Sequence, residues 1–281
     1  MAKRRSDPVA GHRYARAPMT ARVSSLRRSA AALALLAALA TACSNTGKPT
    51  LEAAPAASTT TAPVTTTTVP DTAPIGPHNL LGYIATPTGA PQVHEAPDAS
   101  SPAVEIGETT PAGAPMTFAV VGTPADGDAW LRVVLPTRPN DHTGFVPADS
   151  VTVTRTDLRA FVDLAARTLV VERDGADVAR YTVAVGTTDN PTPVGAGYVT
   201  ELLETPAPDG AYGPYAFGLS LHSDQITEFG EGGDGQVGIH GTNRPDLIGE
   251  AVSHGCVRLD NDDIRALVAL EVPLGMPVFV T

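Results

Sequence analysis

The chain carries the run Ser253-His254-Gly255-Cys256-Val257-Arg258-Leu259, and Ile239-His240-Gly241-Thr242-Asn243 lies shortly before it. A cysteine becomes a strong nucleophile as its thiolate, and an imidazole within hydrogen-bond reach is the usual group that takes the thiol proton. Gly241 and Gly255 have no Cβ, so backbone N–H groups and a substrate can approach the sulfur closely. One N–H donor aimed at a developing oxyanion is worth about 3–4 kcal/mol. The pattern therefore indicates a catalytic thiol at Cys256.

Two other interpretations fit the same residue types. An isolated cysteine is most often a small buried apolar residue, and an isolated histidine is usually a hydrogen-bonded structural residue. His240, His254 and Cys256, with His222 as a fourth ligand, also have the side chains of a zinc site. Tetrahedral zinc sites usually draw on closely spaced pairs such as Cys-x-x-Cys, however, and the chain has no such pair.

The two motifs resemble the active-site signature of the YkuD-type L,D-transpeptidases, including the spacing between the histidine and the cysteine. Upstream, Val162-Asp163-Leu164 and residues 190–195 are similar to the family's first strand and to a Pro- and Gly-containing turn. The resemblance covers residues 157–281. It implies a mostly β catalytic domain that needs no metal or cofactor and that acts on the stem peptides of peptidoglycan.

The resemblance also implies the roles of the catalytic group. Cys256 attacks the carbonyl of the third residue of a tetrapeptide stem, and His240 takes the thiol proton. The carbonyl of Gly241 orients the His240 ring, and N–H groups around Gly255 and Cys256, together with His254, form the oxyanion hole. An amine of a second stem resolves the thioester and gives a 3→3 cross-link. A thiol of this kind is also expected to be a carbapenem target.

The resemblance places the substrate contacts around the same motifs and in the segment before them. Ser253 and Arg258 are expected to brace the cysteine loop. Residues 204–218 are rich in Pro, Gly and Ala and fall where the family has a mobile active-site lid. Within this segment, Tyr212 and Tyr215 are either substrate contacts or partly buried aromatic residues. The residues expected to contact the substrate are Ser253, Arg258, Tyr215, His222, Thr242 and Asn243.

Residues 1–43 have the pattern of a secretory signal peptide. Residues 22–28 hold three arginines, residues 30–40 are apolar, and small residues lead to Cys43. The apolar run is too short to cross a bilayer as a helix, which takes about 20 residues. A cysteine after small residues resembles a lipobox, in which Cys43 is lipidated, although Ala40 stands where lipoboxes mostly have Leu. The alternative is a plain signal peptide that is cut at the same place.

Cysteine usage and charge support an exported protein. If Cys43 carries lipid, Cys256 is the single thiol of the mature chain, which favours a chemical use for it. Residues 1–43 hold eight of the 19 Lys and Arg but one of the 30 Asp and Glu, so the rest of the chain has a net charge of about −18. Such an acidic surface argues against nucleic acid and anionic lipid as partners.

Composition and strand patterns divide the rest of the chain into three parts. Residues 44–77 are rich in Thr, Pro and Ala, have no periodic apolar face, and are expected to form a disordered linker. Residues 78–155 hold short apolar strands separated by turns and resemble a bacterial SH3-like barrel, which either binds wall peptides or acts as a spacer. Residues 156–281 are expected to form the catalytic β-sandwich, with a short helix at 261–269.

The sequence as a whole predicts a mostly β, exported and lipid-anchored peptidoglycan L,D-transpeptidase. Its place would be the outer face of the cytoplasmic membrane or the cell wall. Two alternatives stay open. Water in place of the acceptor amine would make the protein an L,D-carboxypeptidase, and an inactive C-terminal domain would make it a non-catalytic lipoprotein that binds or organises the wall.

Overall fold

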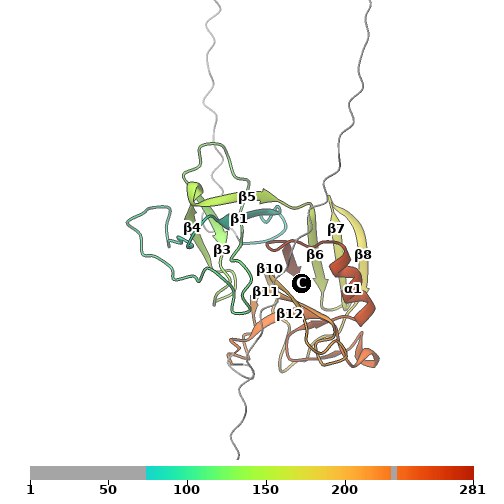
Figure 1. Ribbon diagram of the computed structural model, residues 1–281. Coiled ribbons are helices and arrows are strands. Elements are labelled where there is room, and N and C mark those ends of the chain that lie inside the picture. Colours follow the sequence, from blue (N-terminus) through green and yellow to red (C-terminus); the bar gives the residue numbers. More distant parts are fainter. Residues whose placement is uncertain (1–73, 229–232) are drawn as a thin grey trace, which may run out of the picture. The chain divides into compact units, whose positions relative to one another are not determined.

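The computed structural model describes residues 74–228 and 233–281, which all belong to one compact unit of the chain. The predicted signal peptide, Cys43 and most of the predicted linker lie outside these ranges. Strands predominate in the described part, which has a single α-helix, so the expectation of a mostly β protein is confirmed (Figure 1). No helix among these residues is long and apolar enough to cross a membrane.

The N-terminal module is built from short strands around an apolar core. Its elements are β1 (Tyr83–Pro87), β2 (Phe118–Ala119), β3 (Trp130–Val134), β4 (Thr143–Pro147), the 3₁₀-helix η1 (Ala148–Ser150) and β5 (Val151–Arg155). β1 lies between β2 and β5, and β3 pairs with β4. Leu131 and Val133 are buried because alternate residues of β3 face the core. These strands lie where the sequence predicts them, while the assignment to the SH3-like barrels stays a prediction.

The folded module begins before the predicted boundary at residue 78. The side-chain amide of Asn79 donates to the Pro74 carbonyl at 3.0 Å and accepts from the Gly76 N–H at 2.8 Å. Ile75 packs against an apolar cluster of the fold. The last residues of the predicted linker therefore belong to the folded part.

The C-terminal part is built on an eight-stranded sheet (Figure 1). In spatial order its strands are β14 (Val257–Arg258), β12 (Gln236–His240), β11 (Tyr215–His222), β10 (Gly195–Glu204), β15 (Pro277–Val280), β6 (Leu158–Asp163), β7 (Thr168–Arg173) and β8 (Ala176–Thr182). β12 runs parallel to β14 and β15 runs parallel to β6, whereas the other neighbours are antiparallel. The remaining elements are β9 (Val185–Gly186), η2 (Pro245–Leu247) and β13 (Ala251–Ser253), and β9 pairs with β13.

Local sequence explains one hairpin and the helix. Asp174 and Gly175 connect β7 to β8 with φ angles of 50° and 79°, and a two-residue type I′ turn needs positive φ at both positions. α1 (Asn261–Ala269) follows the N-cap Asp260, whose side chain accepts a hydrogen bond from the backbone two residues later. The helix buries two apolar residues of the predicted stripe. The prediction of a helix at 261–269 is confirmed.

The loop predicted over residues 204–218 is shorter than expected. Glu204 pairs with Tyr215 at the end of the ladder between β10 and β11, so the loop is confined to residues 205–214. Pro214 is the last proline of the segment, and β11 begins directly after it. The prediction was therefore wrong for five residues, Glu204 and residues 215–218.

One apolar cluster joins the N-terminal module to the sheet. Its buried members are Leu80, Ala119 and Val134 of the module and Ala196, Tyr198 and Phe279 of the sheet. The Tyr198 side chain is fully buried, and its hydroxyl has no hydrogen-bond partner within the described ranges. Because the two parts share this core, we expect them to unfold together.

Substitutions at Tyr198 test the shared core. Tyr198→Ala removes a large buried ring and is expected to lower the free energy of unfolding by about 3–5 kcal/mol. Tyr198→Phe removes only a buried unpaired hydroxyl and is expected to change this free energy by less than about 1 kcal/mol. Urea unfolding followed by the fluorescence of Trp130 and by circular dichroism should give one midpoint for each variant. Two separate transitions would contradict a shared core.

Candidate active site

Two parallel strands bring Cys256 and His240 to the same face of the sheet. β12 and β14 pair with His240 opposite Arg258. Two residues before this pair in each strand, Gly238 lies beside Cys256, and the Gly238 backbone N–H donates to the Cys256 Sγ at 3.4 Å. Because side chains alternate along a strand, the thiol and the imidazole point to the same side, with their Cα atoms about 8 Å apart.

The backbone of the next residue holds the His240 ring. Its Nδ1 lies 2.6 Å from the Gly241 carbonyl oxygen, which only accepts, so Nδ1 is assigned the proton and Nε2 is left as the base. The predicted partner of the ring is thus confirmed. His240 is only 3% exposed, and the ring of Tyr212 lies over it with centroids 4.7 Å apart.

The surroundings favour the neutral forms of both groups. Burial lowers the pKa of His240 to about 4, against the opposing effect of the Gly241 carbonyl. Burial also raises the pKa of the Cys256 thiol, while the Gly238 N–H and the Arg258 guanidinium act in the other direction. At neutral pH the site therefore rests as a thiol and a neutral imidazole, not as an ion pair.

Ser253 closes the loop that carries Cys256. Its hydroxyl donates to the Cys256 carbonyl oxygen at 2.5 Å and accepts from the Gly255 N–H at 3.1 Å, so the predicted bracing by Ser253 is confirmed. Gly255 has a φ of 120°, which favours glycine. Because its N–H is already engaged, Gly255 does not serve as the predicted oxyanion donor in this structure. The Cys256 N–H makes no backbone hydrogen bond within the described residues and is the better candidate.

Cys256 and His240 line one cavity of about 270 Å³. The cavity wall is largely apolar, and Cys256 is partly exposed in it. Besides Cys256 and His240, its polar side chains come from Glu201, Tyr212, Ser223, Gln236, His254 and Arg258. Mostly apolar concavities with a few polar groups are the usual form of a binding site for a small group.

Part of the predicted substrate-contact set reaches this cavity. His254 and Arg258 line it, and the Arg258 Nε is buried without a hydrogen-bond partner in the described part of the chain. Tyr215 instead packs against the hydrophobic core of the sheet. Tyr212, three residues earlier, takes the position over His240 and lines the cavity.

Three further predicted contacts, His222, Thr242 and Asn243, lie outside the cavity lining. Asn243 is exposed, whereas Thr242 is buried and its N–H donates to the Asn261 side chain at 2.9 Å. His222 is also buried, and its Nε2 lies 3.1 Å from the Asp234 carboxylate. Thr242 and His222 are thus tied into the scaffold around the site.

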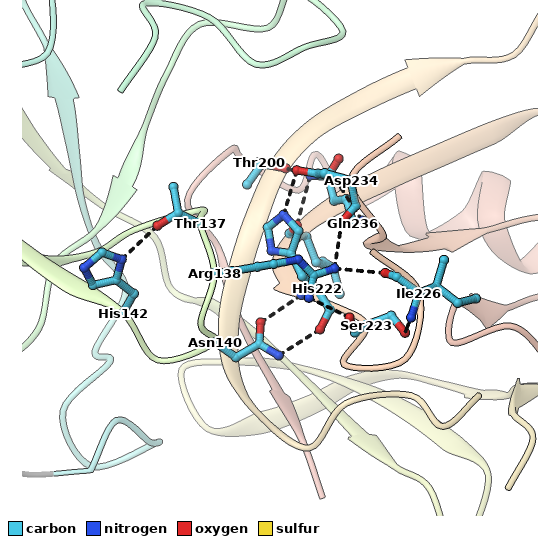
Figure 2. Close-up of polar contacts among 11 residues, drawn as sticks. Thr137, Arg138, Asn140, His142, Thr200, His222, Ser223, Ile226, Asp234 and Gln236 are labelled. Atoms are coloured by element: carbon cyan, nitrogen blue, oxygen red, sulfur yellow. Dashed lines mark hydrogen bonds and ion pairs between the residues drawn. The ribbon is translucent and has the colours of Figure 1, made fainter. Parts of the chain in front are cut away.

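An arginine from the N-terminal module holds one wall of the cavity (Figure 2). Arg138 donates to the main-chain carbonyls of Ser223, Ile226 and Asp234 at 2.7, 2.9 and 2.7 Å. Ser223 and Ile226 both line the cavity. Hydrogen bonds from a charged donor are stronger than those between neutral groups, so this side chain fixes the course of the wall. The sequence indicates only a turn at this position.

Side chains also tie the strands beneath the cavity, where the β11–β12 register shifts between Gly218 and His222. Asn140 of the N-terminal module donates to the His222 carbonyl and accepts from the His222 N–H, both at 2.8 Å (Figure 2). Gln236 donates to the Thr200 hydroxyl at 2.9 Å and to the Leu219 carbonyl at 3.0 Å. These bonds satisfy backbone groups that an irregular ladder leaves open.

The zinc interpretation finds no support in this geometry. Among residues 74–228 and 233–281, no group of three or more His, Cys, Asp or Glu side chains is arranged to hold a metal ion. His222, the fourth ligand considered from the sequence, contacts Asp234 and does not line the cavity of Cys256.

Comparisons with known proteins agree with the site. Residues 157–280 match the family model described as the YkuD L,D-transpeptidase catalytic domain. YkuD of Bacillus subtilis (strain 168), which bears the name of an L,D-transpeptidase, is 34% identical over 119 residues, or 42% of this chain and 63% of the relative. Its namesake in Bacillus licheniformis is 38% identical over 124 residues, or 44% of this chain and 65% of the relative.

Residues 157–280 are thus similar to the YkuD-type L,D-transpeptidase catalytic domain. Among solved structures, an L,D-transpeptidase from Mycobacterium smegmatis aligns with 59% of this chain and 90% of its own, at 16% identity and a TM-score of 0.37. The chain spans less than two thirds of the length of the two YkuD relatives. The similarity to these relatives is confined to the C-terminal part of the chain.

The depressed pKa of His240 makes a prediction about stability. With a pKa of about 4 in the folded state and about 6.5 when unfolded, this histidine takes up a proton on unfolding between these two values. Its neutral form therefore stabilises the fold above pH 6.5, and this contribution is lost as the pH falls toward 4. Between pH 7 and pH 4, we expect the free energy of unfolding to fall by about 3 kcal/mol more for the wild type than for His240→Gln. Urea unfolding at both pH values measures this difference, and equal losses would refute the assignment.

Removal of the Arg138 side chain should loosen the cavity wall. Arg138→Ala deletes three hydrogen bonds to carbonyls, and we expect amide hydrogen exchange in residues 223–226 to rise at least tenfold, or by about 1.4 kcal/mol in local opening. Arg180→Ala is the matched control, because Arg180 forms an exposed ion pair on β8. Equal exchange in the two variants would show that Arg138 does not hold this wall.

Proposed function

We propose that this protein is a peptidoglycan L,D-transpeptidase that forms 3→3 cross-links through a thioester on Cys256. The observation that carries the proposal is the cavity shared by Cys256 and His240, in which the Gly241 carbonyl fixes Nδ1 and leaves Nε2 as the base. A free, partly exposed thiol in such a cavity supports catalysis over a purely scaffolding role for the domain.

The first half of the reaction acylates the enzyme. The Cys256 sulfur attacks the carbonyl carbon of the third stem residue as its proton passes to the His240 Nε2. Because both groups rest in their neutral forms, this proton transfer accompanies the attack and does not precede it. The Cys256 N–H then donates to the developing oxyanion. Collapse of the intermediate breaks the peptide bond, and His240 returns the proton to the amine of the departing D-alanine.

The second half transfers the acyl group to an amine. A neutral side-chain amine of a second stem attacks the thioester carbon, and His240 takes a proton from it. Collapse then forms the new amide and releases the sulfur, which recovers its proton from His240. Water in place of the amine would release a tripeptide, which is the reaction of an L,D-carboxypeptidase.

We further propose that the protein works outside the cytoplasm on a lipid anchor at Cys43. The support is the signal-peptide pattern of residues 1–43 and the Thr- and Pro-rich segment after it. An extended tether of residues 44–73, at roughly 3 Å per residue, would let the folded part reach about 90 Å from a membrane. The net charge of about −18 after residue 43 fits a folded part that does not lie on anionic lipid.

Incubation with a disaccharide-tetrapeptide, followed by mass spectrometry, tests the reaction. We expect the wild type to release D-alanine and to form a 3→3 dimer, and we expect Cys256→Ala to lose at least a thousandfold in rate because the nucleophile is gone. Intact-protein mass should also show a carbapenem adduct on the wild type and none on Cys256→Ala.

The products separate the alternatives. Monomeric tripeptide without dimer would identify an L,D-carboxypeptidase. Equal product formation by both proteins would refute the role of Cys256, and an absence of any product would leave the wall-binding interpretation as the better one. His142→Ala, a change at a half-buried histidine outside the cavity, is a matched control that should retain the wild-type products.

A further inference from the structure

A buried carboxylate lines the cavity of Cys256 and has no role in the reaction described above. Glu201 lies on β10 and is only 5% exposed. Its Oε2 accepts a hydrogen bond of 2.6 Å from the hydroxyl of Thr110, a buried residue of the N-terminal module. This contact fixes the carboxylate and satisfies one of its two oxygens.

The second carboxylate oxygen of Glu201, Oε1, has no donor within the described ranges. Gly218 on the neighbouring strand gives it room, because a Cβ on Gly218 would lie 2.7 Å from Oε1 and from the Glu201 Cγ. Gln236, also in the cavity wall, directs its amide to Thr200 and Leu219 instead. The geometry therefore leaves an acceptor unused inside a largely apolar cavity.

The described part of the chain supplies no cation for this group. Among the residues that the structure describes (74–228 and 233–281), no salt bridge includes Glu201. A buried carboxylate with one neutral hydroxyl partner is costly to maintain, since charges in protein interiors are normally paired. Arg258 lines the same cavity, and its buried Nε likewise lacks an acceptor. In the described part of the chain, the cavity thus holds a carboxylate oxygen of Glu201 and an Nε of Arg258 that have no hydrogen-bond partner.

We propose that Glu201 is a specificity residue that binds the side-chain ammonium of the acyl-donor peptide. The inference rests on the proposed function, because it assigns to the donor stem the cationic group that complements Glu201. An ammonium offers up to three donors, and Oε1 accepts one of them in a charge-assisted bond. Arg258 then complements a carboxylate on the same peptide, so the cavity suits a donor whose side chain carries both charges.

The donor is the better assignment than the acceptor for a chemical reason. The acceptor amine must reach the thioester carbon as a neutral nucleophile, and an amine held as an ammonium by a carboxylate has no free electron pair. The donor ammonium takes no part in bond making and can stay at Glu201 through both steps.

Binding to a variant without turnover tests this recognition. In a Cys256→Ala background, calorimetry compares a tetrapeptide stem with a free side-chain amine and the same peptide acetylated on that amine. We expect the free amine to bind at least tenfold tighter, and we expect Glu201→Gln to abolish this preference by weakening only the free-amine peptide. Glu204→Gln, which removes an exposed charge from the same strand, should keep the preference.

The outcomes separate this proposal from the proposed function. If Glu201→Gln keeps the tenfold preference, or weakens both peptides equally, the assignment of Glu201 is overturned. If the preference is present but the wild type forms no product from the free-amine stem, the binding site stands and the transpeptidase proposal fails. Thermal melting checks that each variant is folded. If Glu201→Gln does not fold, Glu201→Asp is the second variant, because it keeps the carboxylate on a shorter side chain. We expect Glu201→Asp to keep part of the preference for the free amine. An unchanged preference, or an equal loss of affinity for both peptides, would count against the site.

Discussion

The parallel pairing of β12 (Gln236–His240) with β14 (Val257–Arg258) is the constraint on which the site depends. It sets His240 opposite Arg258 and brings the Gly238 N–H to the Cys256 sulfur. A shift of one residue would turn the thiol to the opposite face of the sheet, away from the imidazole and the cavity. The Ser253 hydroxyl bonds to the Gly255 N–H and to the Cys256 carbonyl, and it thereby fixes the loop that leads into β14 at this register.

The burial that this pairing imposes also determines the resting chemistry. An enclosed site disfavours charge, so it lowers the pKa of His240 and raises that of Cys256. The N–H of Gly238 and the guanidinium of Arg258 offset this effect only for the thiolate. Such a site keeps its thiol protonated, and therefore less prone to oxidation and to stray electrophiles, until a carbonyl occupies the cavity. That property suits a single free thiol in a protein predicted to be exported.

Local patterns in the sequence were sufficient for the strands, for the helix and for the expectation that Cys256 and His240 share a site. His240 at a strand end, the Asp-Gly turn and the N-cap Asp260 are each specified by a few adjacent residues. The substrate-contact set was predicted less well, because a loop composition cannot tell which tyrosine turns inward. Tyr215 entered the strand and the core, and Tyr212 covers His240.

The contacts that no local pattern indicates are those between residues far apart in the chain. Thr110 and Glu201 are 91 residues apart, and Arg138 and Ser223 are 85 apart, yet each pair joins the N-terminal module to the lining of one cavity. A module that served only as a spacer would need neither contact. Because Glu201 and Ser223 line the same cavity as Cys256, the module is part of the structure that shapes the site. A substitution at Thr110 or Arg138 therefore reaches the cavity through hydrogen bonds to residues that line it, without any contact to the cysteine or the histidine.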